Sequence, residues 1–157
     1  MSLLISRFRE CDIDTVFEIQ RSSYKPLYEK YHDDELNPYL EPKESVLGKY
    51  TRKGTDGYVF ILDGTPVGAV RIIIDNENKS AKVSALCVKP EYRNKGIAQQ
   101  ALTEIEGMYP GVGMWYLDTI LEETGNCHLY EKLGYRRIGK TEAVNDKMTL
   151  VFYEKRV

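Results

Sequence analysis

The most informative segment of the chain is Val88-Lys89-Pro90-Glu91-Tyr92-Arg93-Asn94-Lys95-Gly96-Ile97-Ala98. It predicts the end of a strand, a short basic loop, and a helix that begins at Gly96. The unpaired backbone N–H groups of a helix N-terminus bind phosphate oxygens, and a glycine lets the anion approach the backbone closely. Arg93 and Lys95 can add charge-assisted contacts. The segment therefore predicts a phosphate-binding loop, although a basic loop before an ordinary surface helix would have the same composition.

The residues on both sides of this loop predict its structural setting. Residues 81–85 alternate between apolar and polar side chains, which is typical of a half-buried strand. The alternation stops at Leu86-Cys87-Val88, where the strand is either distorted or buried on both faces. After the loop, apolar residues recur at helical spacing from Gly96 to Gly107. The loop therefore joins a buried strand to an amphipathic helix.

Patterns along the rest of the chain predict a single α+β domain spanning residues 1–157, with a mixed central β-sheet flanked by helices. The expected order is β-α-α-βββ-α-β-α-ββ. Strands are expected at residues 3–8, 58–62, 67–74, 81–88, 114–119, 135–138 and 148–153, and helices after residue 12 and at residues 44–53, 96–107 and 126–133. Between Arg21 and Pro42, three prolines are expected to prevent a long helix and to leave short helical pieces and loop.

Composition and charge exclude several classes of protein. The formal net charge of -2 gives no general attraction to nucleic acids or anionic membranes. No apolar run is long enough to cross a bilayer or to form the core of a signal peptide. Cys11, Cys87 and Cys127 lack the paired spacing of a disulfide framework or a structural zinc site. We therefore expect a soluble, cytoplasmic protein that binds no metal, nucleic acid or membrane.

A second informative segment is Asn126-Cys127-His128-Leu129-Tyr130-Glu131-Lys132-Leu133-Gly134-Tyr135, which predicts a helix that ends at a glycine. Asn126 and Tyr130 are four residues apart and share one face of this helix. A phenol at this position can protonate a leaving group. It can equally be an ordinary amphipathic residue that packs with Leu133.

Together, the two segments resemble the GNAT family of acetyltransferases. The first matches the family signature Gln/Arg-x-x-Gly-x-Gly/Ala, and the second resembles Asn-x-x-x-Tyr-x-Lys-x-Gly-Phe/Tyr. The resemblance implies that acetyl-CoA is the acetyl donor and that Tyr130 donates a proton to the departing thiolate. It also implies that the phosphate loop holds the pyrophosphate and that the preceding strand contacts the pantetheine arm. The implied cofactor-binding residues are Leu86, Cys87, Val88, Arg93, Asn94, Lys95, Gly96, Ile97, Ala98 and Asn126.

The resemblance further implies an enzyme that moves an acetyl group to a primary amine by direct attack in a ternary complex. The minimal domain favours a small molecule as the acceptor. Two alternatives stay open, namely a protein or peptide N-acetyltransferase and a non-catalytic acyl-CoA sensor. Members of the family are often dimers, so the resemblance also leaves a homodimer open.

The acceptor side matches the family less well. Many members carry a glutamate on the strand before the phosphate loop, where it deprotonates the amine through water. Here that strand is Lys82-Val83-Ser84-Ala85-Leu86, which contains no carboxylate. Asp118 and the two glutamates at residues 122–123 are candidate bases, unless the amine needs none. Tyr24 and Tyr28 are the candidate acceptor-binding residues.

Overall fold

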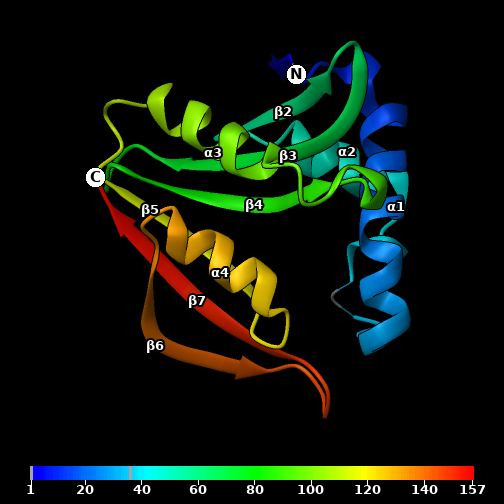
Figure 1. Cartoon of the computed structure of the whole chain (residues 1–157). Coiled ribbons are helices and arrows are strands. Elements are labelled where there is room, and N and C mark those ends of the chain that lie inside the picture. Colours follow the sequence, from blue (N-terminus) through cyan, green and yellow to red (C-terminus); the bar gives the residue numbers. More distant parts are fainter. Residues whose placement is uncertain (1, 36) are drawn as a thin grey trace.

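The computed structural model describes residues 2–35 and 37–157, which form one mixed seven-stranded sheet with two α-helices on each face (Figure 1). The strands are β1 (Leu3–Arg7), β2 (Thr55–Leu62), β3 (Thr65–Asp75), β4 (Ser80–Val88), β5 (Met114–Ile120), β6 (Arg136–Ala143) and β7 (Thr149–Arg156). The α-helices are α1 (Ile13–Tyr31), α2 (Lys43–Tyr50), α3 (Ile97–Gly107) and α4 (Thr124–Lys132), and three 3-10 turns are η1 (Glu10–Asp12), η2 (Pro38–Leu40) and η3 (Pro90–Tyr92). The predicted α+β element order is confirmed.

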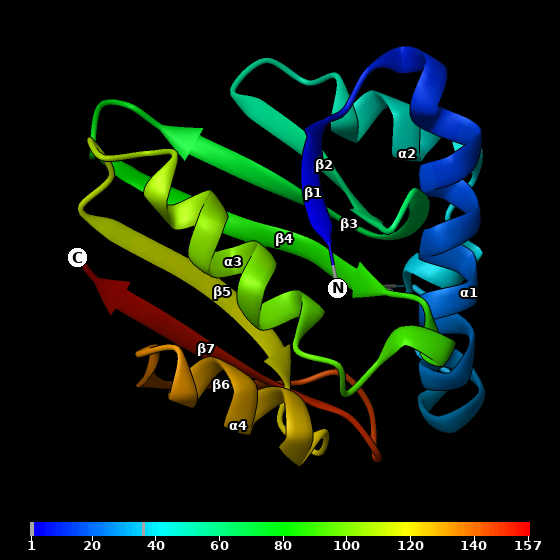
Figure 2. The same ribbon diagram turned by 45° about the horizontal axis from the view of Figure 1, so that its top comes forward.

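The sheet separates two hydrophobic cores. Its strand order is β1-β2-β3-β4-β5-β7-β6, with β4 and β5 parallel and every other neighbouring pair antiparallel. Side chains alternate between the two faces of each strand. On β2, Phe60 therefore packs in the core under α3 and α4, whereas Val59 packs in the core under α1 and α2. Figure 2 shows α3 and α4 together on one face, with α1 and α2 on the other.

Two irregularities at the centre of the sheet create the setting of the site. The strands β4 and β5 pair only from Ser80 to Lys82 of β4, and they diverge beyond that point (Figure 2). Near its end β4 carries a bulge, because the pairing with β3 shifts register between Ala69 and Arg71 and Ala85 has a φ of 52°. The sequence left open whether this strand end is distorted or buried on both faces, and the structure shows a distorted strand in which the consecutive residues Cys87 and Val88 are both buried. Diverging strands leave main-chain groups of β4 without a strand partner on the β5 side.

The prediction of short helical pieces and loop between Arg21 and Pro42 was wrong as far as Tyr31, whereas the short 3-10 turn η2 agrees with it further on. Helix α1 is 19 residues long, continues through Pro26 and ends at Tyr31, and His32 follows in a left-handed conformation with a φ of 49°. Proline inside a helix removes one hydrogen bond and costs about 3 kcal/mol. Burial of one face, including Val16, Ile19 and Tyr31, offsets this cost. The sequence pattern shows the proline but does not show how well this face packs on the sheet.

Gly68 permits the close approach of β3 to the end of β4. A Cβ atom at this position would lie 2.6 Å from Cδ2 of the buried Phe60 and 2.7 Å from the carbonyl oxygen of Cys87. We expect Gly68→Ala to lower the free energy of unfolding by roughly 1–3 kcal/mol, because neither neighbour can move freely. Thermal unfolding measures this loss. The matched control is Gly48→Ala in α2, where a Cβ would meet no atom within 4 Å. An unchanged melting temperature in Gly68→Ala would contradict the packing of β3 on β4.

Candidate active site

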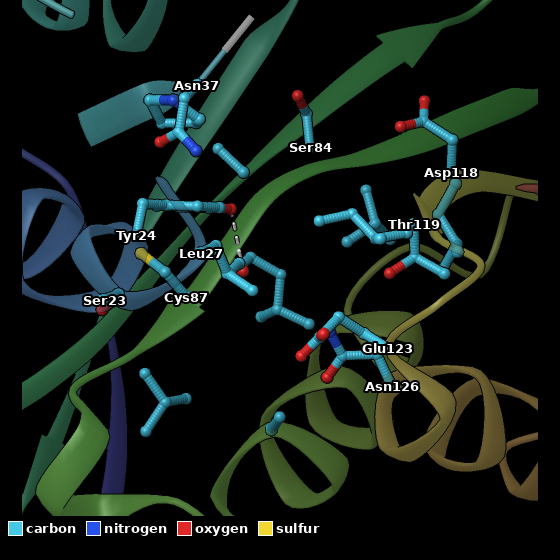
Figure 3. Close-up of a pocket in the computed structure, with 18 of the residues that line it drawn as sticks. Ser23, Tyr24, Leu27, Asn37, Ser84, Cys87, Asp118, Thr119, Glu123 and Asn126 are labelled. Atoms are coloured by element: carbon cyan, nitrogen blue, oxygen red, sulfur yellow. Dashed lines mark hydrogen bonds between the residues drawn. The ribbon is translucent and has the colours of Figure 1, made fainter. Parts of the chain in front are cut away.

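A cavity of about 950 Å³ opens where β4 and β5 diverge. Its walls come from the ends of these two strands, from α1 and the turn that follows it, and from the N-terminal parts of α3 and α4. The candidate cofactor residues other than Lys95, and the candidate acceptor residue Asp118, therefore border one continuous space. Figure 3 shows Asp118 and Thr119 of β5 across the cavity from Ser84 of β4, and Asn126 of α4 beside Glu123.

The phosphate loop has the backbone geometry of an anion cradle. Asn94 and Gly96 are both left-handed, with φ values of 62° and 77°. These turns direct the chain into α3, so that the first N–H groups of the helix stand at the cavity wall with Ile97 and Ala98. A Cβ at Gly96 would meet no protein atom within 4 Å, so the space above it is open. Lys95 does not line the cavity, and its ammonium lies 5.4 Å from the centre of the Tyr92 ring.

Arg93 lines the cavity but also braces the loop. Its Nη2 donates a hydrogen bond to the carbonyl oxygen of Ser23 on α1 at 2.6 Å. Its Nε donates to the carbonyl oxygen of Val88 at 3.4 Å. Through these contacts, the side chain ties α1 to the end of β4. We infer that backbone N–H groups, more than the Arg93 side chain, are free to meet an anion at this wall.

Tyr130 reaches the cavity from α4 and is buried. Burial raises the pKa of its phenol well above the ordinary tyrosine value, and the negative charge of Asp118 adds to this rise. In the described part of the chain, the hydroxyl has no hydrogen-bond partner. Asn126 lies one helical turn earlier and also lines the cavity, as the spacing predicts. The left-handed Gly134, with a φ of 98°, follows the end of the helix as expected.

The two candidate acceptor tyrosines lie in different environments. Tyr24 lines the cavity, and its hydroxyl donates to the carbonyl oxygen of Leu86 at 3.2 Å (Figure 3). It therefore supports the bulge of β4. Tyr28 does not line the cavity, which corrects its placement as an acceptor residue. Its hydroxyl donates to Asp34 at 2.6 Å, and its ring packs against Tyr39. Tyr28 therefore lies only four residues beyond Tyr24 on α1, but it is not part of the cavity wall.

The candidate bases also differ. Asp118 lines the cavity, with Lys82 Nζ at 3.4 Å from its carboxylate. Burial would raise the pKa of Glu123, but hydrogen bonds from Lys30 and Tyr31 outweigh this effect, and its pKa is lowered. These partners approach its Oε2 to 2.7 Å and 2.5 Å. Glu123 therefore joins the end of α1 to the start of α4, and Asp118 is the carboxylate better placed to accept a proton.

A covalent mechanism through Cys87 is disfavoured by its environment. The side chain is buried beside the bulge, and burial raises the pKa of its thiol to about 12. A thiol, unlike a thiolate, is a poor nucleophile. Cys87 therefore contributes backbone and packing at the cavity wall.

Several cavity residues were missed by the sequence analysis. They are Arg71 on β3, Ser84 on β4, Glu41 just before α2, and Lys49 within α2. Arg71 and Ser84 are opposite each other in the β3–β4 register, and Arg71 Nη2 donates to Ser84 Oγ at 3.2 Å. The alternation of β3 indicates only which face of the sheet the Arg71 side chain lies on. Its position at the cavity depends on the pairing of β3 with β4, which brings it next to Ser84, 13 residues later in the chain.

A family model described as the acetyltransferase (GNAT) family matches residues 13–135. The chain belongs to the GNAT acetyltransferase family. It is therefore an N-acetyltransferase, and acetyl-CoA is the acetyl donor, as the two sequence segments predicted. The matched range contains the phosphate loop and Tyr130.

Individual GNAT relatives show the same fold. The chain is 30% identical over 142 residues to the spermidine N(1)-acetyltransferase of Thermoplasma acidophilum, and this match covers 83% of the chain and 78% of the relative. The PaiA N-acetyltransferase from the same organism, solved in complex with coenzyme A, is similar with a TM-score of 0.76 and 23% identity over 100% of both chains. The ribosomal-protein-S18-alanine N-acetyltransferase of Escherichia coli gives a TM-score of 0.80 at 12% identity, covering 99% of this chain and 94% of that one.

Two further observations concern other kinds of site in this GNAT chain. Among residues 2–35 and 37–157, no helix combines the length and apolar character needed to span a membrane. Over the same ranges, no group of three or more His, Cys, Asp or Glu side chains is arranged to hold a metal ion.

Proposed function

We propose that the protein transfers the acetyl group of acetyl-CoA to a primary amine of a small molecule, by direct attack in a ternary complex. The single observation that carries the proposal is the continuous cavity, which extends from the N-terminus of α3 past Tyr130 to the α1–η2 wall. Donor and acceptor can therefore meet in one space. A small acceptor is supported by the relative at 30% identity, which is named for its action on spermidine.

The donor half of the cavity fits acetyl-CoA. The open space above Gly96 and the N-terminus of α3 can receive the pyrophosphate, which is a dianion that backbone N–H groups bind well. The bulged end of β4, from Leu86 to Val88, presents main-chain groups to the pantetheine arm. Asn126 extends this wall from α4. The donor supplies the activated acetyl group, and the chain orients it toward Tyr130.

Two side chains would move protons. Tyr130 would give its proton to the departing thiolate, because its phenol is protonated at neutral pH and faces the cavity. Asp118 would accept a proton from the incoming ammonium through water. Its position across the cavity from Ser84 supports this role, because Ser84 stands on the strand where many family members carry their glutamate.

Asp118→Asn is expected to lower kcat/KM about tenfold or more near neutral pH, because the amide cannot accept the proton. The pH–rate profile measures this effect. At high pH the free amine needs no base, so the variant should approach the wild-type rate there. Thr119→Ser on the same strand is the control. A variant profile that parallels wild type at every pH would exclude Asp118 as the base.

The test of the proposed function is calorimetric titration with acetyl-CoA, followed in the same sample by thiol release with a panel of amines. Binding followed by amine-dependent thiol release is the expected result. Binding without release on any amine would favour the acyl-CoA sensor instead. Release only with peptides bearing a free N-terminus would replace the small-molecule acceptor with a protein. Absence of binding would overturn the proposal.

A further inference from the structure

Two of the cations that line the cavity are paired with acids. Lys49 forms an ion pair with Glu41 at 2.7 Å, and Lys82 lies 3.4 Å from Asp118. Glu41 also accepts hydrogen bonds from Gln20 and from the hydroxyl of Ser45, so its carboxylate is fully engaged. These groups leave little net charge at their part of the wall.

Arg71 is different, because its charge has no acidic partner within the residues that the structure describes. One Nη2 donor contacts Ser84 Oγ at 3.2 Å. The guanidinium carbon lies 6.0 Å from the centre of the buried Tyr50 ring. These two neighbours hold the side chain at the cavity wall, and most of its five N–H donors stay available.

The field of Arg71 reaches the reacting part of the cavity. Burial raises the pKa of both Tyr24 and Cys87, and the positive charge of Arg71 opposes this rise at each. Both residues adjoin the bulge of β4, where Tyr24 bonds to the carbonyl oxygen of Leu86. Arg71 is opposite Ser84 in the β3–β4 register, so it lies next to the bulge and lines the same cavity as Tyr24.

Arg93 also lines the cavity, but its hydrogen-bond donors already have partners within the chain. Arg93 directs its donors to the carbonyl oxygens of Ser23 and Val88. Three acidic side chains, Asp33, Asp34 and Glu35, line the cavity at the turn after α1. Asp33 accepts a hydrogen bond from Asn37 at 2.8 Å and Asp34 accepts one from Tyr28, but these neutral donors leave the negative charges in place. The acids and Arg71 thus occupy separate parts of the wall, and each can attract a group of opposite charge.

We propose that Arg71 binds an oxyanion on the acceptor, so that the substrate carries a carboxylate or phosphonate-like group in addition to its amine. The inference rests on the proposed function. Arginine presents a planar set of donors that matches a carboxylate or phosphate in two parallel hydrogen bonds. An oxyanion bound here would neutralise the unpaired charge and direct the amine toward the bulge. Arg71 is then a specificity-determining residue, and an amine that carries an oxyanion is a better acceptor than the matched amine that lacks one.

The test compares matched amines that differ in one group. Amino acids, including γ-aminobutyrate, supply the carboxylate arm, aminopropylphosphonate supplies the phosphonate arm, and butylamine, diaminobutane and the decarboxylated amino acids supply the arm without an oxyanion. The proteins are wild type, Arg71→Gln, Arg71→Lys and the control Arg136→Gln on the exposed strand β6. Each is assayed for kcat/KM, and calorimetry gives the affinity for acetyl-CoA and for aminopropylphosphonate in the presence of coenzyme A.

Wild type should prefer an oxyanion-bearing amine, and Arg71→Gln should lose about 10- to 100-fold in kcat/KM for that amine alone. Arg71→Lys should recover part of the loss, and acetyl-CoA affinity should stay within about twofold in all variants. The amines that wild type prefers show whether the oxyanion is a carboxylate or a phosphonate. A preference for diaminobutane that Arg71→Gln does not change would overturn the inference. The inference would also be overturned if wild type did not bind aminopropylphosphonate, or bound it no more tightly than Arg71→Gln does. This binding measurement applies even if no amine in the panel is acetylated. Failure of the proposed function appears separately, as loss of acetyl-CoA binding or of all thiol release.

Discussion

Tyr130→Phe is expected to lower kcat about 10²- to 10³-fold while leaving the affinity for acetyl-CoA nearly unchanged. General acid catalysis commonly contributes a factor of this size. The substitution removes only the hydroxyl, which has no hydrogen-bond partner in the described residues, so the packing of the ring against Tyr135 and Tyr153 should persist. Steady-state kinetics and calorimetry on the same protein measure the two quantities. Tyr116→Phe on β5, at an exposed position outside the cavity, is the matched control.

The pH dependence gives an independent check on Tyr130. Burial holds the pKa of the phenol well above its ordinary value, so the phenol stays protonated at a pH where an ordinary tyrosine has lost its proton. The wild-type kcat should therefore show no loss of the proton donor at about pH 10, where an unperturbed tyrosine would titrate. If kcat fell near pH 10 in wild type but not in Tyr130→Phe, the phenol would have an ordinary pKa, which would contradict its burial. An unchanged kcat in the variant would remove Tyr130 from the mechanism.

Gly96→Val is expected to weaken acetyl-CoA binding about 100-fold, which corresponds to about 2.7 kcal/mol. A Cβ at this position would meet no protein atom within 4 Å, so the added side chain would extend into the open space that we assign to the pyrophosphate. The φ of 77° also disfavours a β-branched residue, which adds about 1–3 kcal/mol of strain. Calorimetric titration measures the affinity, and thermal unfolding confirms that the variant is folded.

The control for this experiment is Gly107→Ala at the other end of α3. Its Cβ would also meet no atom within 4 Å, and no positive φ is required there. Alanine should therefore stabilise the helix by roughly 0.5–1 kcal/mol without changing acetyl-CoA affinity. If folded Gly96→Val binds acetyl-CoA as tightly as wild type, the pyrophosphate lies elsewhere.

The local sequence was sufficient to predict the conformation of the phosphate loop and the helix face that Asn126 and Tyr130 share. The phosphate loop needs a strand end, a turn and a helix start within a few residues, and all of these are encoded by neighbours in the chain. The left-handed Asn94 and Gly96 are residue types that tolerate this conformation. The same holds for Asn126 and Tyr130, because the helical repeat alone places them on one face.

The acceptor half required contacts between distant parts of the chain. Arg71 and Ser84 meet only because β3 and β4 pair in one register. Tyr24 reaches the bulge, and Tyr28 does not, because α1 continues through Pro26 and packs on the sheet. Local periodicity specifies which side chains share a face of an element. The cavity that a face borders depends on how the elements pack, and that depends on burial summed over the whole core.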